Sequence, residues 1–259
     1  MQPLVDGDIL VYRCGFAADS QMKKRFKEEN PGISDDDLAE LLETTDYETH
    51  ALGNVKTVLV DIHDKYGPIN GHLYLTGKGN FREKVATILP YKGNRDPTHK
   101  PKYYDSIREY MHNIHRAKTI TGYEADDEIG MLQTYMGDDS IIVSIDKDLD
   151  MIAGFHYNLM RNEQYYCSKQ YADSRFFWQM LVGDKTDNIP GIRGIGEKRA
   201  DAMVDRCRAD VDAMRHEVQE MYAKQYGDGW EAAYNEVGRL LWIARYREEI
   251  EEGCPLLWN

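Results

Sequence analysis

Short apolar runs alternate with longer polar stretches of helical periodicity through the first two thirds of the chain. Apolar runs at Leu4-Val5, at residues 72–75 and at residues 140–144 predict strands, and the Ile-Ile-Val run in the third predicts a buried one. Helices are predicted over residues 47–66, 103–116 and 124–136. Strands separated by helices indicate an α/β fold with a parallel sheet and crossover helices.

The strand pattern fades beyond residue 172. Helices are predicted over residues 174–183, 197–206, 209–226 and 230–250, with a Gly/Pro-rich turn at residues 189–196. The chain has no internal repeat, low-complexity tract or flexible linker. We therefore predict an α/β unit over residues 1–172 and an all-α unit over residues 173–259.

Composition narrows the class of protein. A chain of 259 residues with 42% hydrophobic content is long enough to bury a core and a smaller lobe. No apolar run approaches the length of a membrane span, and the N-terminus lacks the pattern of a secretory signal. The four cysteines are scattered without a C-x-x-C pair, which argues against a disulfide framework or a cysteine zinc site and favours the reducing cytoplasm.

The distribution of charge matters more than its sum. A net charge of -13 by itself argues against a nucleic-acid partner. However, residues 78–118 contain ten Lys or Arg and four acids, whereas residues 19–50 contain ten acids and four bases. The basic segment indicates a polyanionic ligand bound at one place, and a solvated helix face is the alternative interpretation.

Acidic residues occur where predicted strands end or predicted helices begin. Asp6 ends the first strand, and Asp146 and Asp148 follow the buried strand with a spacing that points both carboxylates the same way. Glu124 and Asp127 share one face of a starting helix, although acids there also act as helix caps. A turn contains two further acids three residues apart, Asp184 and Asp187, a pattern also typical of Asx turns.

Taken together, these acids predict a metal site. The eight carboxylates expected at one edge of the sheet are Asp6, Glu124, Asp126, Asp127, Asp146, Asp148, Asp184 and Asp187. Such a cluster repels itself strongly unless divalent cations lie among the carboxylates. Ligands that are all oxygen select Mg²⁺ or Mn²⁺, and so many carboxylates indicate two ions, the arrangement used in two-metal phosphoryl chemistry.

A glycine turn offers a second polyanion site. Gly191, Gly194 and Gly196 precede a helix whose free N–H groups are suited to binding a phosphate, with Lys198 and Arg199 beside it. The spacing is that of helix-hairpin-helix DNA-binding elements, and a tight turn between two helices is the alternative. A Rossmann site is excluded because no strand precedes the glycines.

Five ordered motifs, spanning residues 4 to about 205, make the chain resemble the 5′-nuclease superfamily. They are Val5-Asp6-Gly7-Asp8, Asn80-Phe81-Arg82 with Tyr91-Lys92-Gly93-Asn94-Arg95, Glu124-Ala125-Asp126-Asp127, Ser144-Ile145-Asp146-Lys147-Asp148, and Gly183-Asp184-Lys185-Thr186-Asp187-Asn188-Ile189-Pro190-Gly191. The superfamily includes flap endonucleases, the 5′-nuclease domain of bacterial DNA polymerase I and phage 5′→3′ exonucleases, of which the phage branch is most similar.

The resemblance implies a PIN-like catalytic lobe, an arch of helices at about residues 82–116, and a C-terminal lobe containing a helix–three-turn–helix. It implies that the eight acids hold two Mg²⁺ ions, with Mn²⁺ able to substitute, and that Lys92 and Arg95 lie near the scissile phosphate, with Arg82 as a further catalytic residue. Residues 191–199 match the element that grips duplex DNA and often holds K⁺ in the family.

One position departs from the family pattern. The family usually has an Asp after the second strand, and Gly77 stands at that place here. We expect the first metal site to be weaker for this reason, and we expect Gly77→Asp to strengthen it. A glycine needed for a positive φ is the alternative.

The predicted function is a Mg²⁺-dependent, structure-specific 5′ nuclease that acts as a monomer on DNA with 5′ ends, flaps or nicks. Its expected location is the cytoplasm, or the host cytoplasm if a phage encodes it. A catalytically weak DNA-junction binder of the same fold is one alternative, motivated by Gly77. An RNA-cutting PIN-like nuclease is another, although the glycine turn and the helical lobe argue against it.

Overall fold

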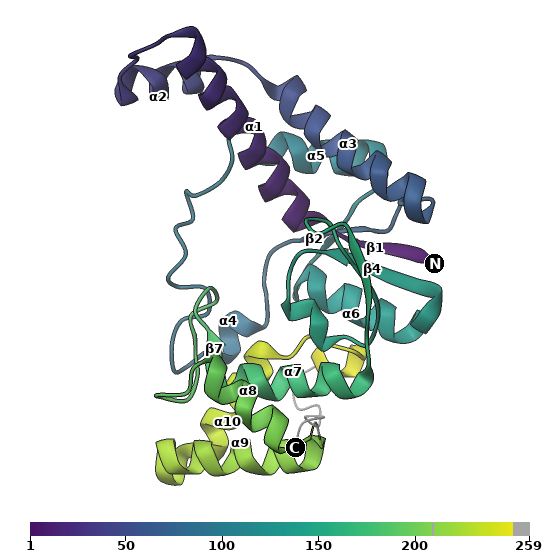
Figure 1. The fold of residues 1–259 in the computed structure, drawn as a ribbon, viewed down its shortest axis with the longest axis vertical. Helices are drawn as coiled ribbons and strands as arrows, with labels where there is room; N and C mark the ends of the chain where they lie inside the picture. The colour runs from purple at the N-terminus through teal and green to yellow at the C-terminus, as the bar shows by residue number, and fades with distance from the viewer. Residues whose placement is uncertain (209, 251–259) are drawn as a thin grey trace.

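The computed structural model describes residues 1–208 and 210–250, and a six-stranded sheet lies at its centre (Figure 1). The strands, in the spatial order β3-β2-β1-β4-β5-β6, are β1 (Gln2–Asp6), β2 (Leu73–Thr76), β3 (Lys118–Ile120), β4 (Ser140–Ser144), β5 (Gly154–Asn158) and β6 (Glu163–Cys167). Neighbouring strands pair in parallel except β5 and β6, which are antiparallel. The predicted α/β class with a mostly parallel sheet is confirmed.

Ten α-helices and a small hairpin complete the described part of the chain. The helices are α1 (Gly7–Glu29), α2 (Asp35–Thr44), α3 (Glu48–Tyr66), α4 (Arg82–Val85), α5 (Tyr104–His115), α6 (Ala125–Met136), α7 (Lys169–Val182), α8 (Glu197–Arg206), α9 (Val211–Tyr226) and α10 (Trp230–Leu241). Short 3-10 turns are η1 (Gly137–Asp139), η2 (Asp148–Met151), η3 (Gly227–Gly229) and η4 (Arg247–Ile250), and the hairpin strands are β7 (Gly183–Asp184) and β8 (Ile189–Pro190).

Helices cover both faces of the sheet, as its parallel strands require. Successive residues of a strand point to opposite faces. Val5 of β1 and Val143 of β4 therefore contribute to the core under α1, α3 and α5. Leu4 and Ile142, their neighbours along the same strands, contribute to the core under α6. This alternation explains why continuous apolar runs, rather than alternating ones, predict these strands.

The four C-terminal helices, α7 to α10, enclose a separate apolar cluster that includes Phe176, Tyr222 and Tyr234. After α10 the chain turns back, and Ile243 packs into the core on the α6 side of the sheet. The boundary that we predict between residues 172 and 173 falls inside α7. The helical part therefore begins four residues earlier, at Lys169, because Ser168 caps the helix by accepting from the Tyr171 N–H.

Several elements are absent from the sequence-based prediction. The 23-residue helix α1 follows β1 directly, because the Asp6 carboxylate accepts the Ile9 N–H and caps the helix where an Asp-Gly turn is also possible. Strands β3 and β6 form the two edges of the sheet, β5 lies next to β6, and β3 has only three residues. Strands β5 and β6 contain several polar residues, such as His156, Glu163 and Gln164. Their pattern is correspondingly weak.

The predicted arch is largely not helical, which corrects our expectation. Only α4 at its start and α5 near its end are helices, and residues 86–103 between them form turns and extended chain. Three prolines, Pro90, Pro97 and Pro101, lie in this stretch and are incompatible with a helix interior. In Figure 1 this segment runs as a long loop from the region of α4 and β7 to the middle of α1, where α5 begins.

The acidic stretch at residues 19–50 forms the second half of α1, all of α2 and the start of α3. Leu38 of α2 is 1% exposed and belongs to the same core cluster as Met22 and Phe26 of α1. The Lys102 ammonium donates to the carbonyls of Leu42, Glu43 and Thr45 at the end of α2, at 2.6–2.8 Å. Lys102, a cation of the basic segment, therefore caps the C-terminal end of α2.

Two further observations concern the class of protein. Over the described residues, none of the helices combines the length and the apolar character that crossing a bilayer requires. Cys14, Cys167 and Cys207 are buried free thiols, and Cys254 lies outside the described residues.

Candidate functional site

The sheet changes direction between β1 and β4, and two predicted ligands lie at that point. Strand β2 lies on one side of β1 and β4 on the other, so the connections leave in opposite directions and open a crevice at the carboxyl ends of the strands. Asp6 ends β1, and Asp146 follows β4 by two residues. The Ser144 hydroxyl donates to Asp6 Oδ2 at 2.7 Å and accepts the Asp146 N–H at 3.0 Å, which links the two acids.

Two other segments bring their acids to the same place. Helix α6 starts directly after Glu124, so Glu124 and Asp126 lie at its N-terminus. The β7–β8 hairpin carries Asp184 and Asp187, and Asp184 Oδ1 accepts the N–H groups of Thr186 and Asp187 to close the turn. Pairing of Gly183 with Pro190 fixes the hairpin against the end of α7.

A cavity of about 620 Å³ joins these segments. Six of the eight predicted ligands line it, namely Glu124, Asp126, Asp146, Asp148, Asp184 and Asp187. The three predicted cations, Arg82, Lys92 and Arg95, line it as well. Residues more than 90 positions apart in the sequence thus meet as the motif pattern predicts.

The carboxylates are crowded and poorly solvated, which disfavours their charged forms. Burial, and then the Asp146 and Asp184 charges, raise the pKa of Asp148 to about 7. Burial, followed by Asp6 and Asp146, raises the pKa of Asp126 well above its ordinary value. The pKa of Asp146 is raised by burial, with Asp187 and Asp184 adding to the effect. A protein stabilises such a group of acids best when cations lie among them.

Two side-chain cations already lie among the acids. The Lys92 ammonium contacts Glu124 and lies 3.5 Å from Asp187 Oδ2, and the Arg95 guanidinium contacts Asp187. Burial opposes charge on Glu124, but Arg82 and Lys92 outweigh it and lower the pKa of this carboxyl. The donor set is all carboxylate, with room in the cavity beside it, and therefore fits hard divalent cations.

Asp6 lies beneath the cavity instead of lining it. It is 2% exposed, and both of its carboxylate oxygens accept hydrogen bonds, from the Ile9 N–H and the Ser144 hydroxyl. Burial, and then the neighbouring Asp8, raise the pKa of Asp6 to about 7. The electrostatic coupling of Asp6 to Asp126 and Asp146 places its charge next to the cluster.

The structure corrects the roles predicted for Asp127 and Arg82. Asp127 is fully buried, and its two oxygens accept from the Arg82 guanidinium at 2.6 and 2.8 Å and from the N–H groups of Glu124 and Ala244. Arg82 also donates to the carbonyls of Leu240 and Trp242, and its side chain is only 3% exposed. This pair holds α4, α6 and the chain after α10 together and positions Glu124. The Asp127 carboxylate is thereby occupied by Arg82 and by backbone N–H groups, while Arg82 itself borders the cavity.

Two expectations for Gly77 are wrong, namely that Gly77→Asp would strengthen the first metal site and that Gly77 has a positive φ. A Cβ atom here would lie 2.6 Å from the Ile120 carbonyl oxygen and 2.8 Å from Thr119 Cγ2. Gly77 is not among the glycines with positive φ, so close backbone approach to β3 is what requires glycine. An aspartate at this position therefore has no room to act as a ligand.

Asp8 is an acid near the site that the sequence motifs contain but to which we assigned no role. Its carboxylate accepts the Thr76 N–H at the end of β2 at 2.8 Å and forms an ion pair with Arg108 at 2.9 Å. Tyr91 is a second such residue, because its hydroxyl donates toward both Glu124 and Asp187 at 2.8–3.0 Å. The only sequence signal for either was its position inside a motif.

The glycine turn connects the β7–β8 hairpin to α8 at one end of the cavity. Gly191 packs against the end of α7, where an added Cβ would lie 2.3–2.5 Å from the backbone of Val182 and Leu181. Gly194 has a φ of +80°, and Gly196 is the exposed N-cap residue of α8 and lines the cavity. The Lys198 and Arg199 side chains are exposed beside it, and Arg199 donates to the Gly194 carbonyl at 2.6 Å.

Comparison with solved structures shows the same fold in two forms of one phage protein. A bacteriophage T5 protein co-crystallised with metal ions aligns with a TM-score of 0.57 and 19% identity over 92% of this chain and 88% of that one. A variant of the bacteriophage T5 flap endonuclease, complexed with DNA and metal ions, aligns with a TM-score of 0.52 and 17% identity over 93% of this chain and 98% of that one.

Sequence comparison finds bacterial DNA polymerases. The chain is 28% identical to DNA polymerase I of Chloroflexus aurantiacus over 241 residues, which is 83% of this chain and 23% of the polymerase. It is 28% identical to the Streptococcus pneumoniae enzyme over 75% of this chain and 22% of the polymerase. The chain therefore spans less than a quarter of the length of these relatives. No family model matches it.

Proposed function

We propose, from the premise that this chain belongs to the 5′-nuclease superfamily, that it hydrolyses DNA phosphodiesters next to 5′ ends, flaps or nicks with the help of divalent cations. The observation that carries the proposal is the cavity at the ends of β1 and β4, where six of the predicted carboxylates, from three segments, lie together with cationic side chains that include Lys92 and Arg95. A purely DNA-binding protein has no use for so many acids facing a polyanion, because they repel it.

Two groups of acids would hold the cations. Glu124 and Asp126, with Asp6 beneath them, form the first group, and Asp146, Asp148, Asp184 and Asp187 form the second. Mg²⁺ is the proposed ion, with Mn²⁺ as a substitute, because both prefer oxygen ligands. The ions would neutralise charge on the phosphate and make bound water more acidic.

Lys92 and Arg95 have a double role in this proposal. Without divalent cations, they neutralise Glu124 and Asp187. When cations take over these carboxylates, the ammonium and the guanidinium are free to contact the scissile phosphate. The backbone hydrogen bond from the Lys92 N–H to the Asp187 carbonyl, at 2.8 Å, keeps the segment anchored to the hairpin during the exchange.

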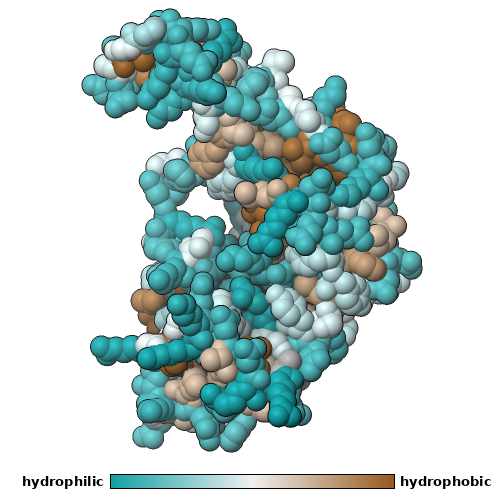
Figure 2. Space-filling view, viewed as in Figure 1, coloured by the Kyte–Doolittle hydropathy of each residue, from teal (hydrophilic) through white to brown (hydrophobic). Residues whose placement is uncertain are grey.

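An opening beside the cavity fits a single strand. Figure 2 shows a hole through the molecule on the side where Figure 1 places the segment between α4 and α5. This segment is exposed and carries Lys92, Arg95 and Lys100. A 5′ single strand that passes under the segment would bring its phosphates to the cavity.

The glycine turn would hold the duplex part of the substrate. Lys198 and Arg199 are exposed in the first turn of α8, next to the cavity-lining residues Gly196 and Glu197, and would contact backbone phosphates, which carry no sequence information. A K⁺ ion bound by carbonyls of this turn belongs to the same proposal. Recognition would then follow the shape of the DNA, and the protein would act as a monomer.

The test is product analysis on 5′-labelled flap, blunt and nicked duplexes across a Mg²⁺ titration. We expect cleavage that requires Mg²⁺ and is confined to positions near the 5′ end or the flap junction. Junction binding without cleavage at any Mg²⁺ or Mn²⁺ concentration would refute the nuclease and favour a DNA-junction binder. Preferential cleavage of matched RNA substrates would refute DNA as the substrate.

A further inference from the structure

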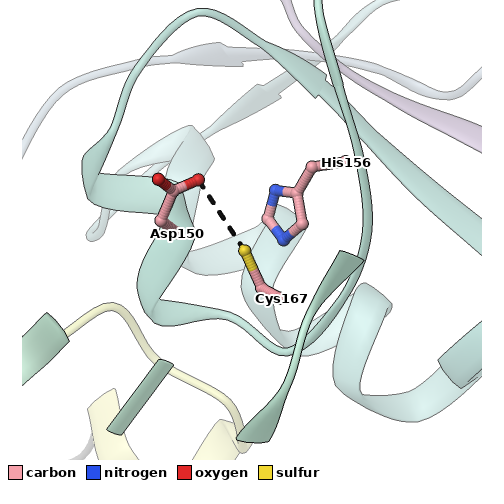
Figure 3. Close-up of side chains that lie close together, drawn as sticks. All are labelled: Asp150, His156 and Cys167. Carbon is pink, nitrogen blue, oxygen red and sulfur yellow. Dashed lines mark hydrogen bonds between the residues drawn. The ribbon is translucent and has the colours of Figure 1, made fainter. Parts of the chain in front are cut away.

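A second group of potential metal ligands lies outside the carboxylate cavity and has different chemistry. Asp150 of η2, His156 of β5 and Cys167 of β6 each place one ligand atom within 4.8 Å of the other two. Figure 3 shows the carboxylate, the imidazole and the thiol converging on one point from three elements of the chain. Neither Asp146 nor the hairpin acids take part in this group.

The strand register explains why the three side chains meet. His156 pairs with Tyr165 across the antiparallel β5–β6 ladder, and Cys167 follows Tyr165 by two residues. His156 and Cys167 therefore lie on the same face as diagonal neighbours. Both are buried, at 2% and 1% exposure. The η2 turn immediately before β5 brings Asp150 over this face.

The hydrogen bonds prepare His156 as a ligand. Its Nε2 lies 2.8 Å from the Ile152 carbonyl, which can only accept, so Nε2 carries the proton and the lone pair is on Nδ1. Metal-binding histidines usually donate their other ring N–H to a carbonyl or carboxylate in this way. Burial also lowers the pKa of His156, so the ring stays neutral.

The two other ligands are held by neighbouring contacts. The Tyr165 hydroxyl donates to Asp150 Oδ1 at 2.7 Å, and Cys167 Sγ lies 3.9 Å from the same oxygen. The Tyr165 ring also stacks on the His156 ring, with centroids 5.3 Å apart. Carboxylate and imidazole are thus each fixed by a second contact, as in a built metal site.

We propose that Asp150, His156 and Cys167 form a zinc-type structural metal site that joins η2 to the β5–β6 hairpin. A sulfur, a nitrogen and an oxygen ligand select Zn²⁺ or Co²⁺ over Mg²⁺. In a tetrahedral site with bonds of about 2.0–2.3 Å, the ligand atoms are roughly 3.3–3.8 Å apart. Side-chain movements of about 1 Å would therefore bring the three ligand atoms to bonding distance of one ion, and water would be the fourth ligand. The Cys167 thiol loses its proton to solvent when the ion binds.

The position gives the site a consequence for the carboxylate cavity. Asp150 is two residues from Asp148, and both belong to η2. A bound ion would fix η2 between β4 and β5 and so limit the motion of Asp148. We expect Zn²⁺ to stabilise the protein without supplying the ion that acts on DNA.

Cobalt absorbance tests this site separately from the carboxylates. Metal-free protein is titrated with Co²⁺ in excess Mg²⁺, which saturates the all-oxygen cavity. We expect one equivalent of Co²⁺ to give tetrahedral visible bands and a near-ultraviolet thiolate-to-cobalt band, both removed by Zn²⁺. Cys167→Ser should abolish the thiolate band, and His156→Ala should weaken Co²⁺ binding at least tenfold. Cys207→Ser, a buried thiol in the C-terminal cluster, should leave the spectrum unchanged.

Three results would overturn the proposal. They are the absence of a thiolate band in the wild-type protein, its persistence in Cys167→Ser, and its loss in a folded Cys207→Ser variant. The wild-type titration decides the question if a variant fails to fold, as judged by circular dichroism. A Zn²⁺-dependent rise in Tm should also persist in Asp146→Asn, and its loss there would place the zinc in the carboxylate cavity instead.

Discussion

Lys92 tests the proposal that divalent cations displace its ammonium from the carboxylates. Removing the ammonium should raise the Mg²⁺ affinity and lower the rate of DNA cleavage. Methionine has a similar length and no charge, so Lys92→Met removes the ammonium that contacts Glu124 and lies 3.5 Å from Asp187. The free protein should bind Mg²⁺ more tightly, because the ion no longer competes with the ammonium. DNA cleavage should become slower, because the phosphate loses a positioned cation.

The structure sets the size of both effects. Two unit charges 3.5 Å apart interact by about 4–5 kcal/mol at an effective dielectric of about 20. The Lys92 side chain is 28% exposed, and solvent screening reduces this to about 1.5–3 kcal/mol. Mg²⁺ affinity should therefore rise about 10- to 100-fold. Loss of a positioned charge-stabilising group costs about 10²–10³-fold in rate.

Calorimetric titration with Mg²⁺ in the absence of DNA measures the first effect, and single-turnover cleavage of a 5′-flap duplex at saturating Mg²⁺ measures the second. Lys185→Met is the matched control. Lys185 also borders the cavity, but among the described residues it forms no ion pair with a carboxylate. The control removes the same unit of charge without breaking a contact, and it should change affinity by less than about threefold.

Equal Mg²⁺ affinities for Lys92→Met and Lys185→Met would show that the ammonium does not compete with the metal. An unchanged cleavage rate in a folded Lys92→Met variant would remove the residue from the reaction. If affinity rose and the rate did not fall, Lys92 would serve only to neutralise the acids.

Four other substitutions test the remaining roles. Asp146→Asn should reduce cleavage at least 10³-fold while DNA affinity stays equal or rises, measured by parallel cleavage and binding titrations, and turnover near the wild-type rate would contradict its role as a ligand. Lys198→Ala should weaken duplex binding uniformly and reduce the slope of log K against log salt by about one, and an unchanged slope would take the glycine turn out of DNA contact. Arg82→Met leaves Asp127 buried without its partner and should cost about 3–5 kcal/mol in urea unfolding, whereas a loss below about 1 kcal/mol would mean that the pair is not structural. Gly77→Ala should destabilise the fold by about 1–3 kcal/mol, and a thermal melt identical to wild type would show that the contact with β3 is relieved easily.

The sequence by itself determined the positions of the main strands and the chemistry at their ends. Apolar runs and helical periodicity are local properties, and they predict β1, β2, β4 and the helices α3, α5 and α6 to within a few residues. Asp146 was placed correctly for the same reason, because an acid that follows a buried parallel strand must emerge at its carboxyl end. The order of the motifs then predicted which family the chain resembles.

Only the tertiary structure decided which of the motif residues are available for chemistry. Asp127 and Asp126 are neighbours with identical side chains, yet Asp127 is turned toward Arg82, 45 positions away, and Asp126 toward the cavity. Gly77 was misread because its steric constraint comes from β3, more than 40 residues later. The group of Asp150, His156 and Cys167 likewise depends on the register of β5 with β6. These contacts join residues that are far apart along the chain. A local sequence pattern cannot predict them, because the packing of the whole fold determines which side chains come into contact.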